Sequence, residues 1–179
     1  MDNHTRPDHE FPGSAHASAD PASADPQSAD QGADDRSLRA SRTLPSVVVE
    51  RRVEWADTDA AGHYHFSSVL RWAEAAEAVL LRRLGLDSLF GSIPRVHFEA
   101  DYLERLWFGD AVQIELRVEK VGTSSLHYRF DVRGPKGPAA TGRMSVVHSA
   151  ATAKGTAPWP EETRRVLQEA GPQTPESYA

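Results

Sequence analysis

One long helical segment, set among strand-like segments, constrains the fold of this chain more than any other feature. Between Ser67 and Gly85, apolar side chains recur at helical spacing, at Val69, Trp72, Ala73, Ala76, Val79, Leu80 and Leu84. Ser67 or Ser68 can cap the first N–H groups, and Gly85 can adopt the left-handed conformation that ends a helix. Because alanines are frequent in this segment, a sheet can approach it closely. We therefore expect one helix that is wrapped by a sheet.

Segments with the pattern of β-strands surround this helix. A β-branched run begins after Pro45, and four later segments alternate apolar and polar residues. The apolar positions that share a face are Val96, Phe98, Ala100 and Tyr102; Val112, Ile114, Leu116 and Val118; Leu126, Tyr128, Phe130 and Val132; and Met144, Val146 and His148. Turn residues at 108–110, 122–124 and 134–138 imply antiparallel hairpins. The sequence thus predicts an α+β domain, with a five-stranded antiparallel sheet around the helix.

The ends of the chain differ in composition from this domain. Residues 1–43 hold almost no large apolar side chains and repeat Ser-Ala-Asp three times, so we expect a disordered acidic tail. The folded domain is expected over residues 44–160. Residues 161–179 are expected to form a C-terminal tail that can include a short helix over residues 161–170.

The composition excludes several classes of protein. The net charge is -6, and no cluster of Lys and Arg is present, which argues against binding to nucleic acid. The chain has no cysteine, so disulfides, Cys-ligated zinc and a thiol nucleophile are excluded. No apolar stretch is long enough to cross a bilayer. We expect a soluble cytoplasmic protein without membrane partners.

Chemistry-bearing residues gather between the first strand and the helix, in residues 57–66. This segment holds Asp57, Asp59, Gly62, His63 and His65 directly before the helix start. The free N–H groups of a helix start favour developing negative charge, and a carboxylate close by can attack a carbonyl or deprotonate water. No Gly-x-Ser-x-Gly elbow or nucleotide-binding glycine loop is present. The arrangement suits hydrolysis of a thioester, whose thiolate leaves readily.

Several motifs resemble one known family. They are residues 54–63 with the helical run 69–76, residues 94–102, Phe108-Gly109-Asp110, residues 121–125 and Pro158-Trp159-Pro160. Together they resemble the 4-hydroxybenzoyl-CoA thioesterase-like branch of the hot-dog enzymes, over about residues 44–160. The resemblance implies a hot-dog fold, acyl-CoA thioesterase activity, and a homodimer or homotetramer with active sites between subunits. CoA is then part of the substrate, and no retained cofactor is expected.

The resemblance also assigns roles to individual residues. Asp59 matches the catalytic carboxylate of the family, and the backbone N–H of Phe66 matches the donor that polarises the thioester carbonyl. Where many members carry Val-Tyr or Asn-Asn, this chain has His63-Tyr64-His65. We treat His63, Tyr64, His65 and Trp72 as candidates for the substrate pocket.

Several residues near this segment have simpler explanations. Asp57 is expected to hold the loop through hydrogen bonds to backbone N–H groups. Two histidines and an aspartate without a fourth ligand make a weak case for a metal, so none is predicted. Glu74 and Glu77 lie on the helix, where another hot-dog branch carries its catalytic carboxylate. We expect them to be solvated or interface charges, because glutamate is rarely buried.

The function predicted from the sequence is hydrolysis of a small, medium or aromatic acyl-CoA to the free acid and CoA. Two alternatives remain open at this point. The thioester could be carried by an acyl-carrier protein of a polyketide or fatty-acid pathway, or the chain could be a non-catalytic acyl-binding module.

Overall fold

The computed structural model describes residues 43–149 and 155–178, which belong to one compact unit. Apart from Thr43, the segment predicted to be a disordered tail lies outside the described residues. The strands are β1 (Ser46–Arg52), β2 (Arg95–Tyr102), β3 (Ala111–Val121), β4 (Ser125–Gly134), β5 (Gly137–Val147) and β6 (Glu176–Ser177). The helices are α2 (Ser68–Arg83) and α3 (Glu161–Glu169), with short 3-10 turns η1 (Trp55–Asp57) and η2 (Asp87–Leu89).

The strands form one mixed sheet in the order β2-β5-β4-β3-β1-β6. Strands β1 to β5 pair antiparallel, as the short connections predicted. The prediction of five strands was wrong, because β6 adds a sixth strand that runs parallel to β1. This strand has only two residues, Glu176 and Ser177, so it carries no alternating apolar pattern by which it could be recognised.

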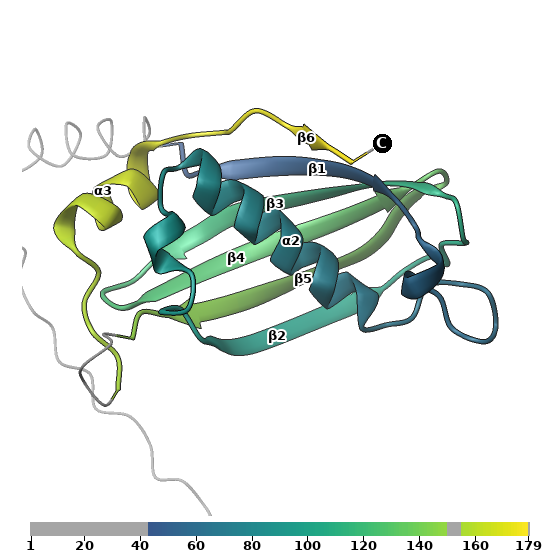
Figure 1. The fold of residues 1–179 in the computed structure, drawn as a ribbon, viewed down its shortest axis with the longest axis horizontal. Helices are drawn as coiled ribbons and strands as arrows, with labels where there is room; N and C mark the ends of the chain where they lie inside the picture. Colours follow the sequence, from purple (N-terminus) through teal and green to yellow (C-terminus); the bar gives the residue numbers. More distant parts are fainter. Residues whose placement is uncertain (1–42, 150–154, 179) are drawn as a thin grey trace, which may run out of the picture. The chain divides into compact units, whose positions relative to one another are not determined.

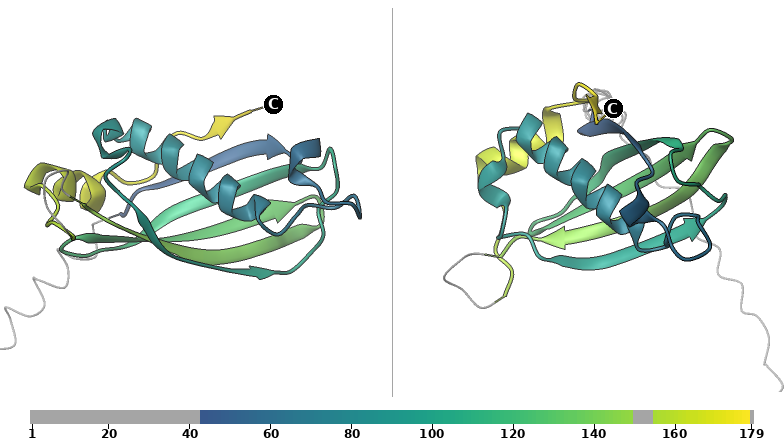
Figure 2. Two further views of the ribbon diagram at one scale, coloured as in Figure 1. Left: turned by 60° about the horizontal axis from the view of Figure 1, so that its bottom comes forward. Right: turned by 45° about the vertical axis from the view of Figure 1, so that its right-hand side comes forward.

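Helix α2 lies across one face of the curved sheet, as Figures 1 and 2 show. Val69, Trp72, Ala73, Ala76 and Leu80 are all at most 1% exposed, which confirms the predicted apolar face. Methyl side chains at two of these positions keep the helix axis close to the strands. The α+β architecture of a sheet around one long helix is therefore confirmed.

The ends of α2 differ in how well they were predicted. Gly85 has φ +67°, so the left-handed residue that ends the helix is where the sequence placed it. At the other end, Ser67 is the N-cap residue, but its side chain makes no capping hydrogen bond. The prediction of serine capping was wrong, because Ser67 and Ser68 bond to other groups of the preceding turn.

The alternating strands bury most of their apolar faces against α2, but not every residue of the predicted faces. Tyr102 on β2 is 45% exposed, and His148, predicted to share a face with Met144 and Val146, lies beyond the end of β5. Phe130, Leu126, Ile114 and Met144 have no exposed side-chain surface. Val96, by contrast, is 60% exposed. Strand β2 is an edge strand, and its pairing with β5 shifts register between Arg95 and His97, so Val96 leaves the face that the alternation assigns to it.

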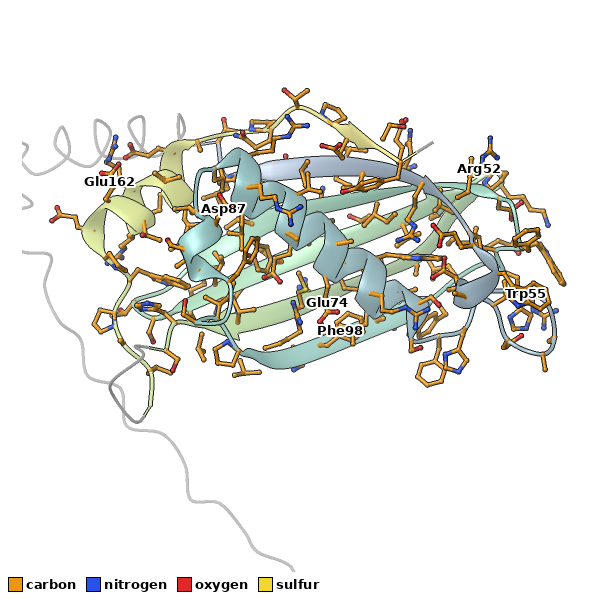
Figure 3. The ribbon with its side chains drawn as sticks, viewed as in Figure 1. Arg52, Trp55, Glu74, Asp87, Phe98 and Glu162 are labelled. Carbon is orange, nitrogen blue, oxygen red and sulfur yellow. The ribbon has the colours of Figure 1, made fainter. Side chains whose placement is uncertain are left out.

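Glu77 was expected to be a solvated or interface charge, and this expectation was wrong. Its side chain is buried beneath α2, where Arg95 Nη2 on β2 donates to its Oε2 at 2.5 Å. Burial raises the pKa of Glu77, while Arg95 opposes the rise. Glu74 is exposed and also pairs with Arg95. Figure 3 labels Glu74 on the side of α2 that faces β2. The charge cluster therefore joins the central helix to an edge of the sheet.

The C-terminal segment packs against the same unit. Helix α3 ends at Glu169, one residue before the predicted end, and its Leu167 has no exposed surface. Trp159, just before α3, is 5% exposed and donates from Nε1 to the carbonyl of Ser125 at 3.3 Å. Within the described residues, neither helix is long and apolar enough to cross a bilayer.

Candidate active site

The segment that follows η1 forms a tight hairpin around Asp59. Thr58 and Tyr64 make an antiparallel bridge, and the N–H of Gly62 donates to the carbonyl of Asp59 at 3.0 Å. Gly62 has φ +81°, a conformation that a residue with a side chain rarely adopts. Asp59 Oδ1 accepts the N–H of Ala61 at 2.8 Å, which fixes the carboxylate on the loop. Only one of the two carboxylate oxygens is used in this way.

Asp57 anchors the base of this hairpin. It is 4% exposed, and its Oδ2 accepts the N–H of Glu54 at 3.0 Å. Its Oδ1 accepts Nε1 of Trp72 at 3.1 Å, and Arg71 Nη2 lies 3.3 Å from the same oxygen. These contacts show Asp57 holding the loop, as the sequence predicted. Trp72 was predicted to line the pocket, but it is completely buried, and its indole N–H donates to Asp57.

The turn that enters α2 leaves a backbone donor free. Ser68 Oγ donates to the carbonyl of Asp57 at 2.8 Å, and Ser67 Oγ lies 2.7 Å from Nδ1 of His65. Both hydroxyl groups are thus directed away from the helix start. In residues 43–149 and 155–178, no acceptor is in hydrogen-bond geometry with the N–H of Phe66. The first N–H groups of a helix also lack partners within it, so this region attracts negative charge.

Asp59 and Phe66 line one cavity of about 690 Å³. Its remaining walls are His63, Tyr64, His65, Tyr102, Leu103, Glu104 and Arg105. The side chain of Asp59 is 30% exposed, and its Oδ2 lies 3.5 Å from Nδ1 of His63. The same space is therefore lined by a carboxylate, of which one oxygen accepts no backbone N–H, and by Phe66, whose own N–H has no acceptor among the described residues. Such a pair can activate water, or attack directly, while it stabilises an oxyanion.

Two tyrosines shape the wall of this cavity. Tyr102, at the end of β2, donates from its hydroxyl to the carbonyl of Phe66 at 2.9 Å and so orients the peptide before α2. Tyr64 is 6% exposed and stacks on Trp72 with ring centroids 5.8 Å apart. Burial raises the pKa of Tyr64, and nearby Tyr102 and Glu104 add to the rise. Tyr64 therefore stays a neutral hydroxyl at the boundary of core and cavity.

The two histidines of the motif point to different partners. His63 Nδ1 lies 3.2 Å from the carbonyl of Tyr64, whereas the His65 ring pairs with Ser67. In the part of the chain that the structure describes, no three His, Cys, Asp or Glu side chains gather in a way that could hold a metal. His63 instead lies beside Asp59, and His65 lies in ring contact with Phe66.

Sequence reasoning missed the part of the cavity that comes from residues 102–105. Leu103, Glu104 and Arg105 were not singled out, and Tyr102 was assigned only to a strand face. These residues meet the motif because the N–H of Tyr64 donates to the carbonyl of Leu106, and His63 bridges with Trp107. The sequence feature that could have indicated these residues is the apolar pair Tyr102-Leu103, which lies at and just after the end of β2. Glu104 adds a second carboxylate to the cavity.

Known proteins resemble this chain in sequence and in fold. A 1,4-dihydroxy-2-naphthoyl-CoA hydrolase from Prochlorococcus marinus strain NATL2A is 32% identical over 109 residues, which cover 54% of this chain and 70% of that protein. A thioesterase from Thermus thermophilus, solved with coenzyme A and Zn, is 28% identical. Its TM-score is 0.61, and the match covers 67% of this chain and 90% of that one.

A more distant structure shares the fold alone. It is a variant of 4-hydroxybenzoyl-CoA thioesterase in complex with 4-hydroxybenzoyl-CoA, 18% identical with a TM-score of 0.61, covering 69% of this chain and 99% of that one. These neighbours confirm the hot-dog fold. The model of the thioesterase-like superfamily matches residues 53–167, which include the hairpin of Asp59, all of α2 and strands β2 to β5. The chain belongs to the thioesterase-like superfamily.

Proposed function

We propose that this protein hydrolyses an acyl-CoA thioester to the free acid and CoA, with Asp59 as the catalytic carboxylate. One observation carries the proposal: Asp59 and Phe66, whose N–H has no acceptor among the described residues, line one cavity just before α2. Relatives named as CoA thioester hydrolases support this class of enzyme. CoA enters as part of the substrate and leaves as the free thiol, and no retained cofactor takes part.

The chemistry assigns one task to each group. The thioester carbonyl oxygen accepts a hydrogen bond from the N–H of Phe66, which has no acceptor among the described residues. As a nucleophile adds to the carbonyl carbon, this donor and the helix start stabilise the oxyanion. The C–S bond then breaks, and the CoA thiolate leaves with little need for an acid. Of the two hydrogens of the water molecule, one goes to the thiolate sulfur and the other stays on the new carboxyl group.

Asp59 acts in one of two ways, and the same carboxylate serves both. As a general base it takes a proton from the attacking water, whereas as a nucleophile it forms an acyl anhydride that water then cleaves. Single-turnover hydrolysis in ¹⁸O-labelled water separates these routes. Label retained in the protein, with an unlabelled acid, indicates the nucleophile, because water has then attacked the carboxyl carbon of Asp59. Label in the acid alone fits both routes, so trapping of an acylated protein by rapid acid quench decides between them.

An aromatic acyl group suits this cavity best. Tyr64, Phe66 and Tyr102 line it together with His65, so aromatic side chains border the space beside Asp59. Stacking on such rings contributes about 0.5–1.5 kcal/mol beyond the burial of area. The relatives are named for an aromatic substrate, 1,4-dihydroxy-2-naphthoyl-CoA, which supports the same choice.

Thiol release from a panel of acyl-CoAs tests the proposal. The panel contains benzoyl-, 4-hydroxybenzoyl- and 1,4-dihydroxy-2-naphthoyl-CoA beside acetyl-, hexanoyl- and palmitoyl-CoA. We expect kcat/KM for the aromatic esters to exceed that for the aliphatic esters by tenfold or more. Lack of turnover with every ester would refute hydrolase function, and a preference for an aliphatic ester would refute the aromatic assignment alone.

We also propose that the protein acts as a homo-oligomer. Strand β2 is an edge of the described sheet, so one row of its backbone groups has no strand partner. Val96 on this strand is 60% exposed, and Phe66 and Leu103 beside the cavity are 64% and 58% exposed. A second copy of the chain pairing along β2 would cover these apolar side chains. Sedimentation equilibrium tests this, and a monomer at micromolar concentration refutes it.

A further inference from the structure

The positive charges of this protein are not equally engaged. Most described arginines lie within 4.0 Å of a carboxylate; Arg143, for example, pairs with Glu99 and Glu119. The arginines and lysines without an ion pair among the described residues are Arg52, Arg105, Lys120, Arg133, Lys136 and Arg164. All six are exposed, so their charges are available to a soluble ligand.

Four of these six cations lie at one end of the sheet. Arg52 ends β1, Arg133 lies near the end of β4, and Lys136 lies in the turn between β4 and β5. Arg105 belongs to the loop that borders the candidate active site. Figure 3 shows Arg52 at the end of the molecule where Trp55 and the Asp59 hairpin also lie. The unpaired charge is therefore concentrated beside the catalytic cavity.

Three adjoining cavities connect these cations to Asp59. Arg105 lines both the catalytic cavity and a smaller one of about 80 Å³, which Lys136 also lines. Gly134 and Pro135 line that smaller cavity and a third one of about 450 Å³, which contains Arg133 and Arg52. Because neighbouring cavities share lining residues, Arg105, Lys136 and Arg133 follow one another along the surface from Asp59 to the β4–β5 turn.

The acidic residues beyond Asp59 are already used by other groups. Glu50, which lines the third cavity, accepts Gln113 Nε2 at its Oε1 at 2.8 Å. Glu104 Oε1 accepts the N–H of Arg105 at 2.9 Å, and Asp110 Oδ2 accepts the N–H of Trp107 at 2.8 Å. None of these carboxylates lies within ion-pair distance of a described Arg or Lys side chain. The cations are thus left without an internal counter-charge, and an anion is the partner that they fit.

We propose that Arg105, Lys136 and Arg133 bind the phosphate groups of the nucleotide end of CoA, on the assumption that the proposed hydrolase function holds. The thioester lies at Asp59, the pantetheine arm runs past Arg105, and the diphosphate and 3′-phosphate lie over the β4–β5 turn. Arginine presents a planar fork of donors that suits phosphate oxygens, and lysine adds a point charge. This surface selects CoA esters over esters of short thiols that lack phosphate.

Calorimetric titration of the 179-residue chain with free CoA, and with pantetheine as the ligand without phosphate, tests this surface. The variants are Arg133→Gln combined with Lys136→Gln, the single Arg105→Gln, and Lys120→Gln as the matched control. Lys120 is likewise exposed and unpaired, but it lies on the far part of β3. Circular dichroism checks that each variant is folded.

We expect the Kd for CoA to rise about tenfold in the double variant and about threefold in Arg105→Gln, since exposed charge pairs contribute modestly. Lys120→Gln is expected to bind CoA like wild type, and pantetheine is expected to bind all four proteins alike. Salt should weaken CoA binding more in wild type than in the double variant.

An equal Kd for CoA in wild type and the double variant would overturn the phosphate surface. A loss of affinity for pantetheine equal to that for CoA would overturn it too, because the effect would not come from phosphate. The inference would also be overturned if wild type does not bind CoA but hydrolyses an acyl group on an acyl-carrier protein. In that case the cations would bind the carrier protein. If CoA binds as predicted but no thioester is hydrolysed, only the proposed hydrolase function fails.

Discussion

Replacement of Asp59 by asparagine isolates the charge of the candidate catalytic group. In the native protein Oδ1 accepts the N–H of Ala61 at 2.8 Å, and the amide oxygen of asparagine can accept it as well. The amide nitrogen then takes the place of Oδ2, which lies 3.5 Å from His63. The hairpin is preserved, while the negative charge and the second acceptor oxygen are lost. The variant therefore tests chemistry with little change in structure.

The expected magnitude follows from these contacts. A positioned general base contributes about 10²–10⁴ to the rate, equivalent to about 2.7–5.4 kcal/mol of transition-state stabilisation. A neutral acceptor in place of a charged one weakens the hydrogen bond to Ala61 by about 1 kcal/mol or less at a site whose side chain is 30% exposed. We expect kcat to fall at least a hundredfold in Asp59→Asn, with KM within about threefold of wild type.

Thiol release from the best aromatic acyl-CoA measures both constants, and urea unfolding measures stability. Glu104→Gln is the matched control, since it removes the other carboxylate that lines the same cavity. A fall in kcat of less than tenfold is expected for this control. A kcat for Asp59→Asn within threefold of wild type would refute the assignment of Asp59. A larger loss in Glu104→Gln than in Asp59→Asn would transfer the role to Glu104.

Three further changes test the surrounding structure. Gly142→Ala should lower the free energy of unfolding by about 1–3 kcal/mol, because its Cβ would lie 2.1 Å from the carbonyl oxygen of Glu99. Urea unfolding should show a lower midpoint concentration with an unchanged dependence on urea, and an unchanged midpoint contradicts this close approach. Because folding raises the pKa of Glu77, the free energy of unfolding of wild type should fall relative to that of Glu77→Gln as the pH rises above 4.5, by at most about 1.4 kcal/mol per pH unit. Parallel plots of unfolding free energy against pH for the two proteins would refute this. Tyr102→Phe should lower kcat about fivefold by releasing the carbonyl of Phe66; unchanged kcat refutes that role.

Regular periodicity explains which parts of the fold could be predicted. The helix and strands β3 and β4 repeat an apolar pattern over ten or more residues, and these predictions agreed with the structure in type and buried face. In β5 only Met144 and Val146 follow the predicted pattern, and His148, predicted to share their face, lies beyond the end of the strand at Val147. Strand β6 has two residues, so only its pairing with Val49 and Glu50 identifies it as a strand. The burial of Glu77 depends on Arg95, which the β2–β5 pairing brings beneath the helix. Pairings between distant segments set both features, and local sequence does not encode them.

The same distinction applies to the candidate site. Residues 57–66 were found because turn chemistry, acidic residues and a helix start are adjacent in sequence. Residues 102–105 complete the cavity from the other side, and long-range contacts bring them there, such as the bridge between His63 and Trp107 and the hydrogen bond from Tyr64 to Leu106. Trp72 was misassigned because an aromatic residue one turn into the helix can face either the cavity or Asp57. The buried Asp57 carboxylate decides between them by accepting its indole N–H.

The failed capping prediction bears directly on the chemistry. Had Ser67 or Ser68 capped α2, a hydroxyl oxygen would have satisfied N–H groups of the first helical turn. The positive end of the helix dipole would then be less available to an oxyanion held at the N–H of Phe66. In the structure Ser67 turns to His65 and Ser68 to the carbonyl of Asp57, so the helix start stays without a side-chain cap. An uncapped helix start costs about 1 kcal/mol of stability. The folded chain retains this loss at the helix end that directly follows Phe66, a lining residue of the cavity. Such a loss is expected where a substrate supplies negative charge at the helix start.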